Sequence, residues 1–402
     1  MFRQQTSRSS SFRSRPGFGG QARWRPMTRR PRIGRSQFSD VSKFIKKAIP
    51  ISEDKPYVAV NSFTGFSVDE RLKKNVLVAG YHCPTPIQDQ AIPHILNGRD
   101  IVGIANTGTG KTVAFIFPLL DKVAKDKKQN VLIVAPTREL AIQINQELVK
   151  FSFGLSIFSV CVVGGMPIFR QINDLRRNHN FIIGTPGRIK DLIKRDCLRL
   201  NNFRTVVLDE SDRMLDMGFI NDMRFIMRAM PKERQTLFFS ATLSADVKHV
   251  INEFLNDPIS VSVKNGDTVH SVEQDVVYVK NAPKLDLLHD LLIKPEFSKV
   301  LIFGRTKHGV ELLSNLLTAR GFKAESIHGN KNHSQRQRAL KLFKDNAVKV
   351  LVATDVAARG LDIPNVSHVI NYELPSTYED YIHRIGRTGR AGKTGKALTF
   401  VG

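Results

Sequence analysis

The chain has 402 residues, of which 41% are hydrophobic and 24% charged, and its formal net charge is +24. This length exceeds one ordinary core and fits two domains plus a tail. No apolar run approaches the ~20 residues that a membrane-spanning helix needs, so we expect no membrane insertion. The charge excess favours nucleic acid as a partner over a membrane surface, because the basic residues do not line one face of an apolar helix.

Residues 1–38 form an arginine-rich tail. Ten arginines are interleaved with serine, glycine and proline, and no acidic residue precedes Asp40. Too little apolar surface is present to offset the entropy of ordering, so we predict disorder. Phe12, Phe18 and Trp24 would help the tail bind single-stranded nucleic acid. The alternatives are a spacer without a binding role and a transit peptide.

Strands and helical segments alternate from about residue 61 onwards. Short β-branched or aromatic runs recur at 101–104, 131–134, 181–183, 206–208 and 237–239, and again at 300–303, 350–353, 368–370 and 398–401. This alternation predicts an α/β fold with parallel sheets covered by helices. A polar stretch near 264–284 interrupts it, which predicts two lobes. We place the N-terminal lobe at 39–263, a linker at 264–283 and the C-terminal lobe at 284–402.

A phosphate-binding loop is predicted at residues 105–112, between a predicted strand and an apolar helical run. Its glycines would let backbone N–H groups approach a polyphosphate, Lys111 would reach the β- and γ-phosphates, and the Thr112 hydroxyl would face Mg²⁺. The residues expected at this loop are Ala105, Asn106, Thr107, Gly108, Thr109, Gly110, Lys111 and Thr112.

An acidic pair, Asp209-Glu210, ends the predicted strand at 206–208. Downstream of a phosphate-binding loop, such a pair can hold Mg²⁺ and orient an attacking water. We expect Asp209 to be the metal carboxylate and Glu210 the base. The sequence therefore predicts a nucleotide hydrolase.

The motifs resemble those of the DEAD-box RNA helicases over about residues 61–402. Further segments match in family order: Pro84-Thr-Pro-Ile-Gln88, Pro136-Thr-Arg-Glu-Leu140, Gly164-Gly165, Thr185-Pro-Gly-Arg188, Ser240-Ala-Thr242, Ala353-Thr-Asp355 and His383-Arg-Ile-Gly-Arg-Thr-Gly-Arg390. The resemblance implies two RecA-like lobes, the cofactors ATP and Mg²⁺, and ATP hydrolysis coupled to local unwinding or remodelling of RNA. Residues 304–308 and 328–331 are most similar to the bacterial RhlE-type branch.

The resemblance also implies how the nucleotide is recognised. The family's Q motif would cover about residues 61–89, with Gln88 hydrogen-bonded to adenine and Phe63 stacked on it. Reading the base with an amide would favour ATP over GTP. Gly360 and Asp362 would contact the nucleotide, with Asp362 at the ribose.

Catalysis would draw on both lobes. Besides Lys111, Asp209 and Glu210, the resemblance assigns Arg387 and Arg390 to the γ-phosphate. Hydrolysis would then require closure of the lobes and would be stimulated by RNA bound across them. Coupling between the lobes would involve Asp212, Ser240, Thr242 and His383.

RNA contacts are implied by the resemblance in both lobes. The expected residues are Thr137, Arg138, Gly165, Pro186, Gly187 and Arg188 in the first lobe and Thr306, Lys307, His328, Gly329 and Thr354 in the second. Contacts to phosphate and sugar fix position without reading bases, so binding should be sequence-nonspecific and sensitive to salt. Contacts to 2′-hydroxyls would favour RNA over DNA.

Three residues depart from the family pattern: Ser211 stands where alanine is usual, Asn106 where glutamine is usual, and His333 where glutamine is common. The Ser211 hydroxyl either finds a partner or costs about 1 kcal/mol if it is buried unpaired. His333 puts one contact of the second lobe in doubt. We expect activity to survive, because both carboxylates of the acidic pair are intact.

Two other functional classes remain open on the sequence. One is an RNA clamp that binds ATP without turnover, against which Glu210, Arg387 and Arg390 argue. The other is a DNA helicase or another P-loop ATPase, against which the Gln88 region and residues 185–188 argue. Three scattered cysteines without metal-ligand spacing favour a cytoplasmic location. We expect a monomer.

Overall fold

The computed structural model describes residues 45, 57–106, 108–263, 272–280, 282–358, 363, 365–389 and 395–402, with only the backbone at 379. The predicted arginine-rich tail at 1–38 lies outside these residues, and so does its predicted disorder. Among the residues described, no helix combines the length and apolar character that crossing a bilayer requires.

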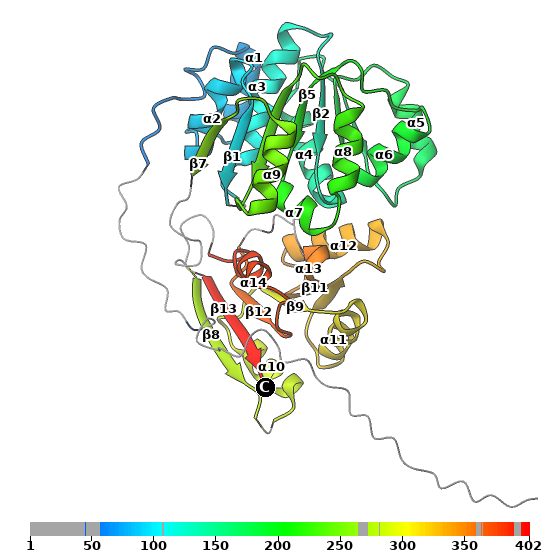
Figure 1. Cartoon of the computed structure of the whole chain (residues 1–402). Helices are drawn as coiled ribbons and strands as arrows, with labels where there is room; N and C mark the ends of the chain where they lie inside the picture. Colours follow the sequence, from blue (N-terminus) through cyan, green and yellow to red (C-terminus); the bar gives the residue numbers. More distant parts are fainter. Residues whose placement is uncertain are drawn as a thin grey trace, which may run out of the picture. The chain divides into compact units, whose positions relative to one another are not determined.

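The first sheet has seven parallel strands in the order β3-β4-β2-β5-β6-β1-β7 (Figure 1). Their bounds are β1 Ile101–Ala105, β2 Asn130–Val134, β3 Ser159–Val162, β4 Phe181–Gly184, β5 Phe203–Leu208, β6 Gln235–Ser240 and β7 Ile259–Val263. The central strands β1, β2, β4 and β6 are buried almost throughout, because helices cover both faces of the sheet.

Nine helices accompany this sheet in the described part of the N-terminal lobe. They are α1 Glu70–Val78, α2 Pro86–Leu96, α3 Lys111–Lys125, α4 Arg138–Phe151, α5 Ile168–Leu175, α6 Pro186–Lys194, α7 Ser211–Asp216, α8 Ile220–Arg228 and α9 Ala245–Phe254. Two apolar clusters lie on the two faces of the sheet. Helices α1 to α4 contribute to one cluster, and α5 to α9 contribute to the other.

The second sheet has six parallel strands in the order β10-β11-β9-β12-β13-β8. Its elements are β8 Val272–Tyr278, α10 Lys284–Ile293, β9 Val300–Gly304, α11 Lys307–Ala319, β10 Ala324–Ile327, α12 His333–Lys344, β11 Val350–Thr354, α13 Asp355–Ala358, β12 His368–Asn371, α14 Tyr378–Ile385 and β13 Gly395–Val401. Helices α10 and α11 pack on one face, and α12 and α13 on the other. Two helix-covered parallel sheets confirm the predicted fold class.

Every predicted strand lies within an observed one, but four observed strands were missed, namely β3, β7, β8 and β10. All four are the outermost strands of their sheets. Edge strands are partly exposed and tolerate polar side chains, so they lack the continuous apolar run that marks a central strand. The strand β8 falls within the stretch predicted as a linker, yet it pairs with β13 over its whole length.

Candidate functional site

The predicted phosphate-binding loop connects β1 to α3. Gly108 and Gly110 have φ of 83° and 91°, a left-handed conformation that costs glycine nothing. Lys111 begins α3, is buried, and donates from Nζ to the Ala105 carbonyl at 2.7 Å. The Thr109 hydroxyl donates to the Asn106 carbonyl at 2.8 Å. The loop thus presents glycine N–H groups and a lysine at a helix N-terminus, the arrangement that suits a polyphosphate.

Gln88 ties the start of α2 to this loop. Its Oε1 accepts from the Thr85 backbone N–H at 2.9 Å, and its Nε2 donates to the Gly110 carbonyl at 3.0 Å. A Cβ on Gly110 would overlap the Gln88 amide, so only glycine allows this approach.

The expectation that Phe63 stacks on adenine is corrected by its position. Its ring is fully buried and makes edge contacts with Phe117, Phe66 and Tyr81, at centroid distances of 5.3, 6.3 and 6.4 Å. A ring enclosed by aromatic neighbours has no face for a base. The aromatic residue that lines the pocket is Tyr81, whose hydroxyl donates to Glu147 at 2.7 Å.

Asp209 and Glu210 follow β5, and both are buried. Burial raises the pKa of Asp209 to about 7, an effect that the charge of Lys111 opposes and that of Glu210 reinforces. Burial alone would raise the pKa of Glu210 too, but Arg213, Lys111 and Arg387 outweigh it and hold that pKa below its usual value. Arg213 donates to Glu210 at 2.6 Å. Glu210 itself has φ of 48°, a strained conformation for a residue with a side chain.

Asp212 connects the acidic motif to the turn after β6. Its Oδ2 accepts from the backbone N–H groups of Ala241 and Thr242 at 3.0 and 2.9 Å and from the Thr242 hydroxyl at 3.2 Å. The Ser240 hydroxyl donates to the Thr242 carbonyl at 2.8 Å, which fixes the turn. His383 lines two small hollows that Asp212 also lines. The four residues predicted to couple the lobes therefore lie close together.

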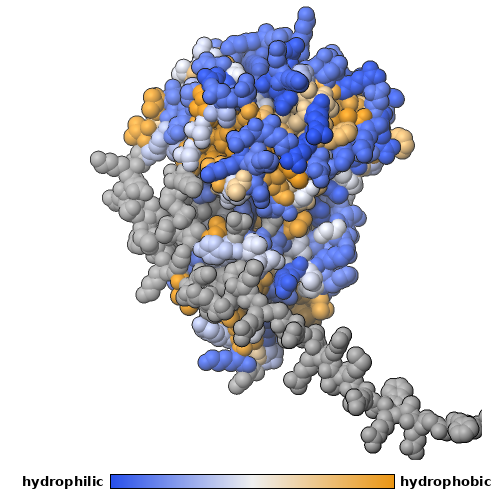
Figure 2. All heavy atoms as spheres, viewed as in Figure 1, coloured by the Kyte–Doolittle hydropathy of each residue, from blue (hydrophilic) through white to orange (hydrophobic). Residues whose placement is uncertain are grey.

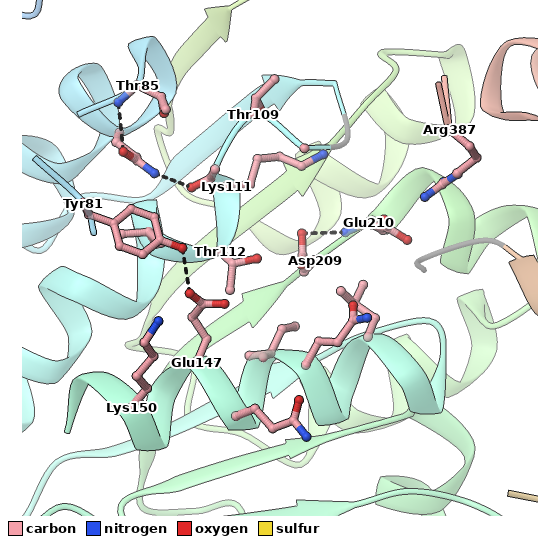
Figure 3. A pocket seen from close by; sticks show the side chains of 18 of the residues that line it. Tyr81, Thr85, Thr109, Lys111, Thr112, Glu147, Lys150, Asp209, Glu210 and Arg387 are labelled. Carbon is pink, nitrogen blue, oxygen red and sulfur yellow. Dashed lines mark hydrogen bonds between the residues drawn. The ribbon is translucent and has the colours of Figure 1, made fainter. Parts of the chain in front are cut away.

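One cavity of about 540 Å³ collects the nucleotide-site residues. Figure 3 shows Lys111, Thr112, Asp209 and Glu210 around it, with Tyr81 and Arg387 at opposite ends of the view. The lining also includes Gln88, the glycines of the phosphate-binding loop and one face of α4. Four predicted site residues, Thr107, Gly360, Asp362 and Arg390, lie outside the described residues.

The predicted RNA residues of the N-terminal lobe gather at one edge of its sheet. They occupy the loops and first helical turns that follow β2, β3 and β4, which are neighbours in the sheet. Thr137 caps α4, and the Arg138 guanidinium lies so close to Gly165 that a Cβ there would overlap it. Arg188 donates twice to the Met166 carbonyl, at 3.3 Å each. Burial lowers the pKa of both arginines, a cost that a bound phosphate would relieve.

Pro186 and Gly187 form the first turn of α6, directly before Arg188. Pro186 is buried at the first helical position, where its missing N–H costs no hydrogen bond. Gly187 is exposed. The Arg188 N–H already donates to the Thr185 carbonyl at 3.1 Å, so Gly187 is the residue of this turn whose N–H has no backbone partner among the described residues.

The predicted RNA residues of the C-terminal lobe lie at the end of β11 or just after β9 and β10, and these three strands are adjacent in the sheet. Thr306 caps α11 by accepting from the Gly309 N–H at 3.0 Å, and Lys307 is exposed beside it. His328 is buried, with Nδ1 accepting from the Asn330 N–H at 3.3 Å.

Because Nδ1 of His328 is an acceptor, the proton is on Nε2, which donates to Glu311 at 2.9 Å. The side chain of His328 is therefore engaged within the lobe, and its turn offers backbone groups instead. Gly329 has open space around its Cα, and Thr354 ends β11 half-buried.

Of the three departures, Ser211 has a clear structural answer. It is fully buried and donates to the Leu208 carbonyl at 2.9 Å, so the added hydroxyl is paired. At Asn106 the backbone carbonyl accepts from the Thr109 hydroxyl, a contact that does not depend on the side chain, so this departure has no structural explanation. His333 begins α12, and burial lowers its pKa.

Two arginines with structural importance were not predicted. Arg213 holds Glu210, three residues along the same helical turn. Arg384 is almost fully buried and donates to both carboxylate oxygens of Asp355, at 2.6 and 2.7 Å. The contact between Arg213 and Glu210 could have been predicted, because an arginine three residues away along a helix can reach a carboxylate. Nothing in the local sequence indicates the contact between Arg384 and Asp355.

Family models match both lobes. The model described as "DEAD/DEAH box helicase" matches residues 85–250, and that described as "Helicase conserved C-terminal domain" matches residues 283–392. The chain belongs to the DEAD-box helicase family. Relatives include the ATP-dependent RNA helicase CshA of Listeria monocytogenes, 46% identical over 346 residues, which are 85% of this chain and 66% of the relative. CshA of Bacillus subtilis is 46% identical over 342 residues, or 85% and 69%.

Two solved structures resemble this fold over both of its sheets. Saccharomyces cerevisiae Dbp5 bound to RNA and ADP BeF3 has a TM-score of 0.76 and 32% identity, covering 85% of this chain and 89% of that one. Mss116p bound to single-stranded RNA and AMP-PNP has a TM-score of 0.77 and 29% identity, covering 88% and 76%. The chain spans about two thirds of the length of the curated relatives it matches.

Proposed function

We propose that this DEAD-box protein is an ATP-dependent RNA helicase whose ATP hydrolysis is stimulated by RNA and requires closure of its two lobes. Its useful output would be local unwinding of RNA duplexes or remodelling of RNA–protein complexes. One observation carries the proposal: the cavity that holds Lys111 and the acidic pair is also lined by Arg387, which follows α14 in the other lobe. Relatives named as RNA helicases, and structures with RNA bound, support it.

The donor set of the cavity fits Mg²⁺. Thr112 and Asp209 offer a hydroxyl and a carboxylate, the hard oxygen ligands that Mg²⁺ prefers. The described residues contain no cluster of three or more His, Cys, Asp or Glu side chains able to hold a metal. This suits an ion held partly by substrate phosphates. When bound, Mg²⁺ would neutralise phosphate charge, and it would favour the ionised form of Asp209 despite its burial.

The chain's own groups would divide the remaining work. The glycine N–H groups and Lys111 bind the phosphates, while Gln88 and Tyr81 border the end of the cavity assigned to the base. Glu210 stays ionised and can accept a proton from the attacking water. Arg387, and by family resemblance Arg390, would stabilise charge on the γ-phosphate. Gly360 and Asp362 stay assigned to the nucleotide by the same resemblance.

RNA would lie across the loops after β2, β3 and β4 and those after β9, β10 and β11. Arginines and helix starts there suit phosphate, so binding should be independent of sequence and weaken with salt. The network of Asp212, Ser240 and Thr242, beside His383, would pass the state of the nucleotide to the RNA site. ATP hydrolysis without bound RNA would therefore be slow.

Several finer assignments stay predictions. These are the boundaries at 38, 263 and 283, a monomer, a cytoplasmic location, and the RhlE-type branch; the relatives reported above are CshA proteins instead. The arginine-rich tail would add RNA affinity. Deleting residues 1–38 should weaken binding and flatten its salt dependence, whereas an unchanged slope would make the tail a spacer.

The test is phosphate release by the full chain with single-stranded RNA, double-stranded RNA and double-stranded DNA. We expect RNA stimulation that Glu210→Gln and Lys111→Ala abolish. No release with any RNA would leave the RNA clamp as the better function. Equal stimulation by double-stranded DNA would instead favour a DNA-directed ATPase.

A further inference from the structure

A second hollow, of about 750 Å³, lies on the N-terminal lobe between α6, α8 and α9. Figure 1 shows these three helices on the same lobe, with α8 between α9 and α6. We call this hollow the α8 groove; its lining includes Lys190, Arg224, Phe225 and Arg228. It shares no residue with the nucleotide cavity.

The α8 groove combines an aromatic ring with an excess of cations. The half-buried ring of Phe225 has the ammonium groups of Lys190 and Lys194 at 5.8 and 6.0 Å from its centre. Figure 2 shows that hydrophilic residues cover most of the described surface of the face drawn, with hydrophobic residues in small groups. An aromatic residue beside lysines and arginines suits single-stranded nucleic acid, which offers bases to stack and phosphates to pair.

Internal ion pairs use only part of this charge. Lys190 pairs with Asp222 at 2.6 Å, and Arg224 makes a double contact with Glu253 at 2.9 and 3.0 Å. Within the described part of the chain, no carboxylate lies at ion-pair distance from Lys194 or Arg228, which are both exposed. These two cations remain available for an anionic partner.

The groove adjoins the RNA site proposed above. Gly187 lies in the first turn of α6, and a Cβ on it would be 3.9 Å from Oδ2 of Asp222. The same carboxylate holds Lys190, one helical turn further along α6, or about 5 Å. A stacked strand with the duplex rise of about 3.4 Å per nucleotide covers that distance in one or two nucleotides.

We infer that the α8 groove binds RNA one or two nucleotides beyond the strand held at Gly187 and Arg188. Phe225 packs against a base, and Arg228 and Lys194 pair with phosphates. This rests on the proposed function, and it extends the RNA site past the loops at the sheet edge. An acidic peptide is the rival occupant. The continuity with Gly187 and the aromatic ring favour RNA.

The test uses the full chain and labelled oligouridylates from about 4 to 14 nucleotides, with affinity measured by fluorescence anisotropy. Arg228→Gln and Phe225→Leu should lower affinity for the longest oligomer about tenfold and leave the shortest unchanged. Arg228→Gln should also reduce the salt slope for the longest oligomer by about 0.7. Lys128→Gln is the matched control, because this exposed lysine precedes β2 and so lies at the end of that strand away from the proposed RNA site.

An equal loss at all lengths, or no loss, would overturn the inference while leaving the proposed function intact. Loss of affinity for a polyglutamate peptide in Arg228→Gln, with RNA binding unchanged, would assign the groove to a protein partner instead. A wild-type chain that binds no oligomer of any length would reject the proposed function together with the inference. Phe225→Leu keeps apolar volume, and its melting temperature shows whether it folds.

Discussion

Replacing Gly165 by alanine should weaken RNA binding by displacing Arg138. Gly165 has φ of 76°, where a side chain costs roughly 1–2 kcal/mol. The added Cβ would also overlap the Arg138 guanidinium, which must then move. Losing one charge-assisted contact to phosphate costs about 1.5–3 kcal/mol, or roughly 10- to 100-fold in affinity. The salt slope should fall by about 0.7.

Gly154→Ala separates backbone strain from the clash. Gly154 has a similar φ of 74°, but a Cβ on it meets nothing within 4 Å. It should lose comparable stability and keep wild-type RNA affinity. Fluorescence anisotropy with single-stranded RNA over a salt series measures both variants.

A double-mutant cycle with Arg138→Gln then tests the cause. If Gly165→Ala acts through Arg138, the double variant should bind no more weakly than the weaker single variant. Additive losses would refute the reasoning, because they would mean that Gly165 contributes to binding independently of the guanidinium.

Two further predictions concern stability. Ser211→Ala removes a buried hydroxyl paired with the Leu208 carbonyl, so it should cost about 1 kcal/mol and lower the melting temperature by about 2–4 °C, with RNA-stimulated ATPase retained; an unchanged melting temperature would mean that the hydrogen bond is energetically neutral. Burial lowers the pKa of His368 from 6.5 to about 4. Its contribution to the free energy of unfolding is complete above pH 6.5 and is lost as pH falls toward 4, because the unfolded chain takes up the proton first. Urea unfolding at pH 7 and pH 5 should show wild type losing about 2 kcal/mol more than His368→Gln, and equal losses would contradict the shift.

The central strands and the phosphate-binding loop were predictable because their signals are local. A continuous β-branched run marks a strand covered on both faces, and glycines beside a lysine mark a loop that must approach phosphate. The edge strands were not predictable in this way. In β8, for example, the exposed Glu273 and Asp275 flank a buried residue that is itself polar, Gln274, so the strand shows no apolar run.

The candidate site was predictable to the level of motifs but not of individual neighbours. Phe63 has the expected position in the sequence, yet contacts with Phe117 and Phe66 place its ring in the core. Which aromatic residue borders the pocket depends on how α1 and α2 pack, and that is decided by tertiary contacts. The pairing of Arg384 with Asp355 likewise joins residues 29 positions apart.

The central claim is that hydrolysis needs groups from both lobes. Phosphate release at saturating RNA and ATP, by wild type and Arg387→Gln, tests it most directly. The variant should bind ATP and RNA but hydrolyse about 10³- to 10⁵-fold more slowly, the loss expected when an arginine that stabilises the transferred phosphate is removed. A folded Arg387→Gln variant that releases phosphate at the wild-type rate would contradict the account.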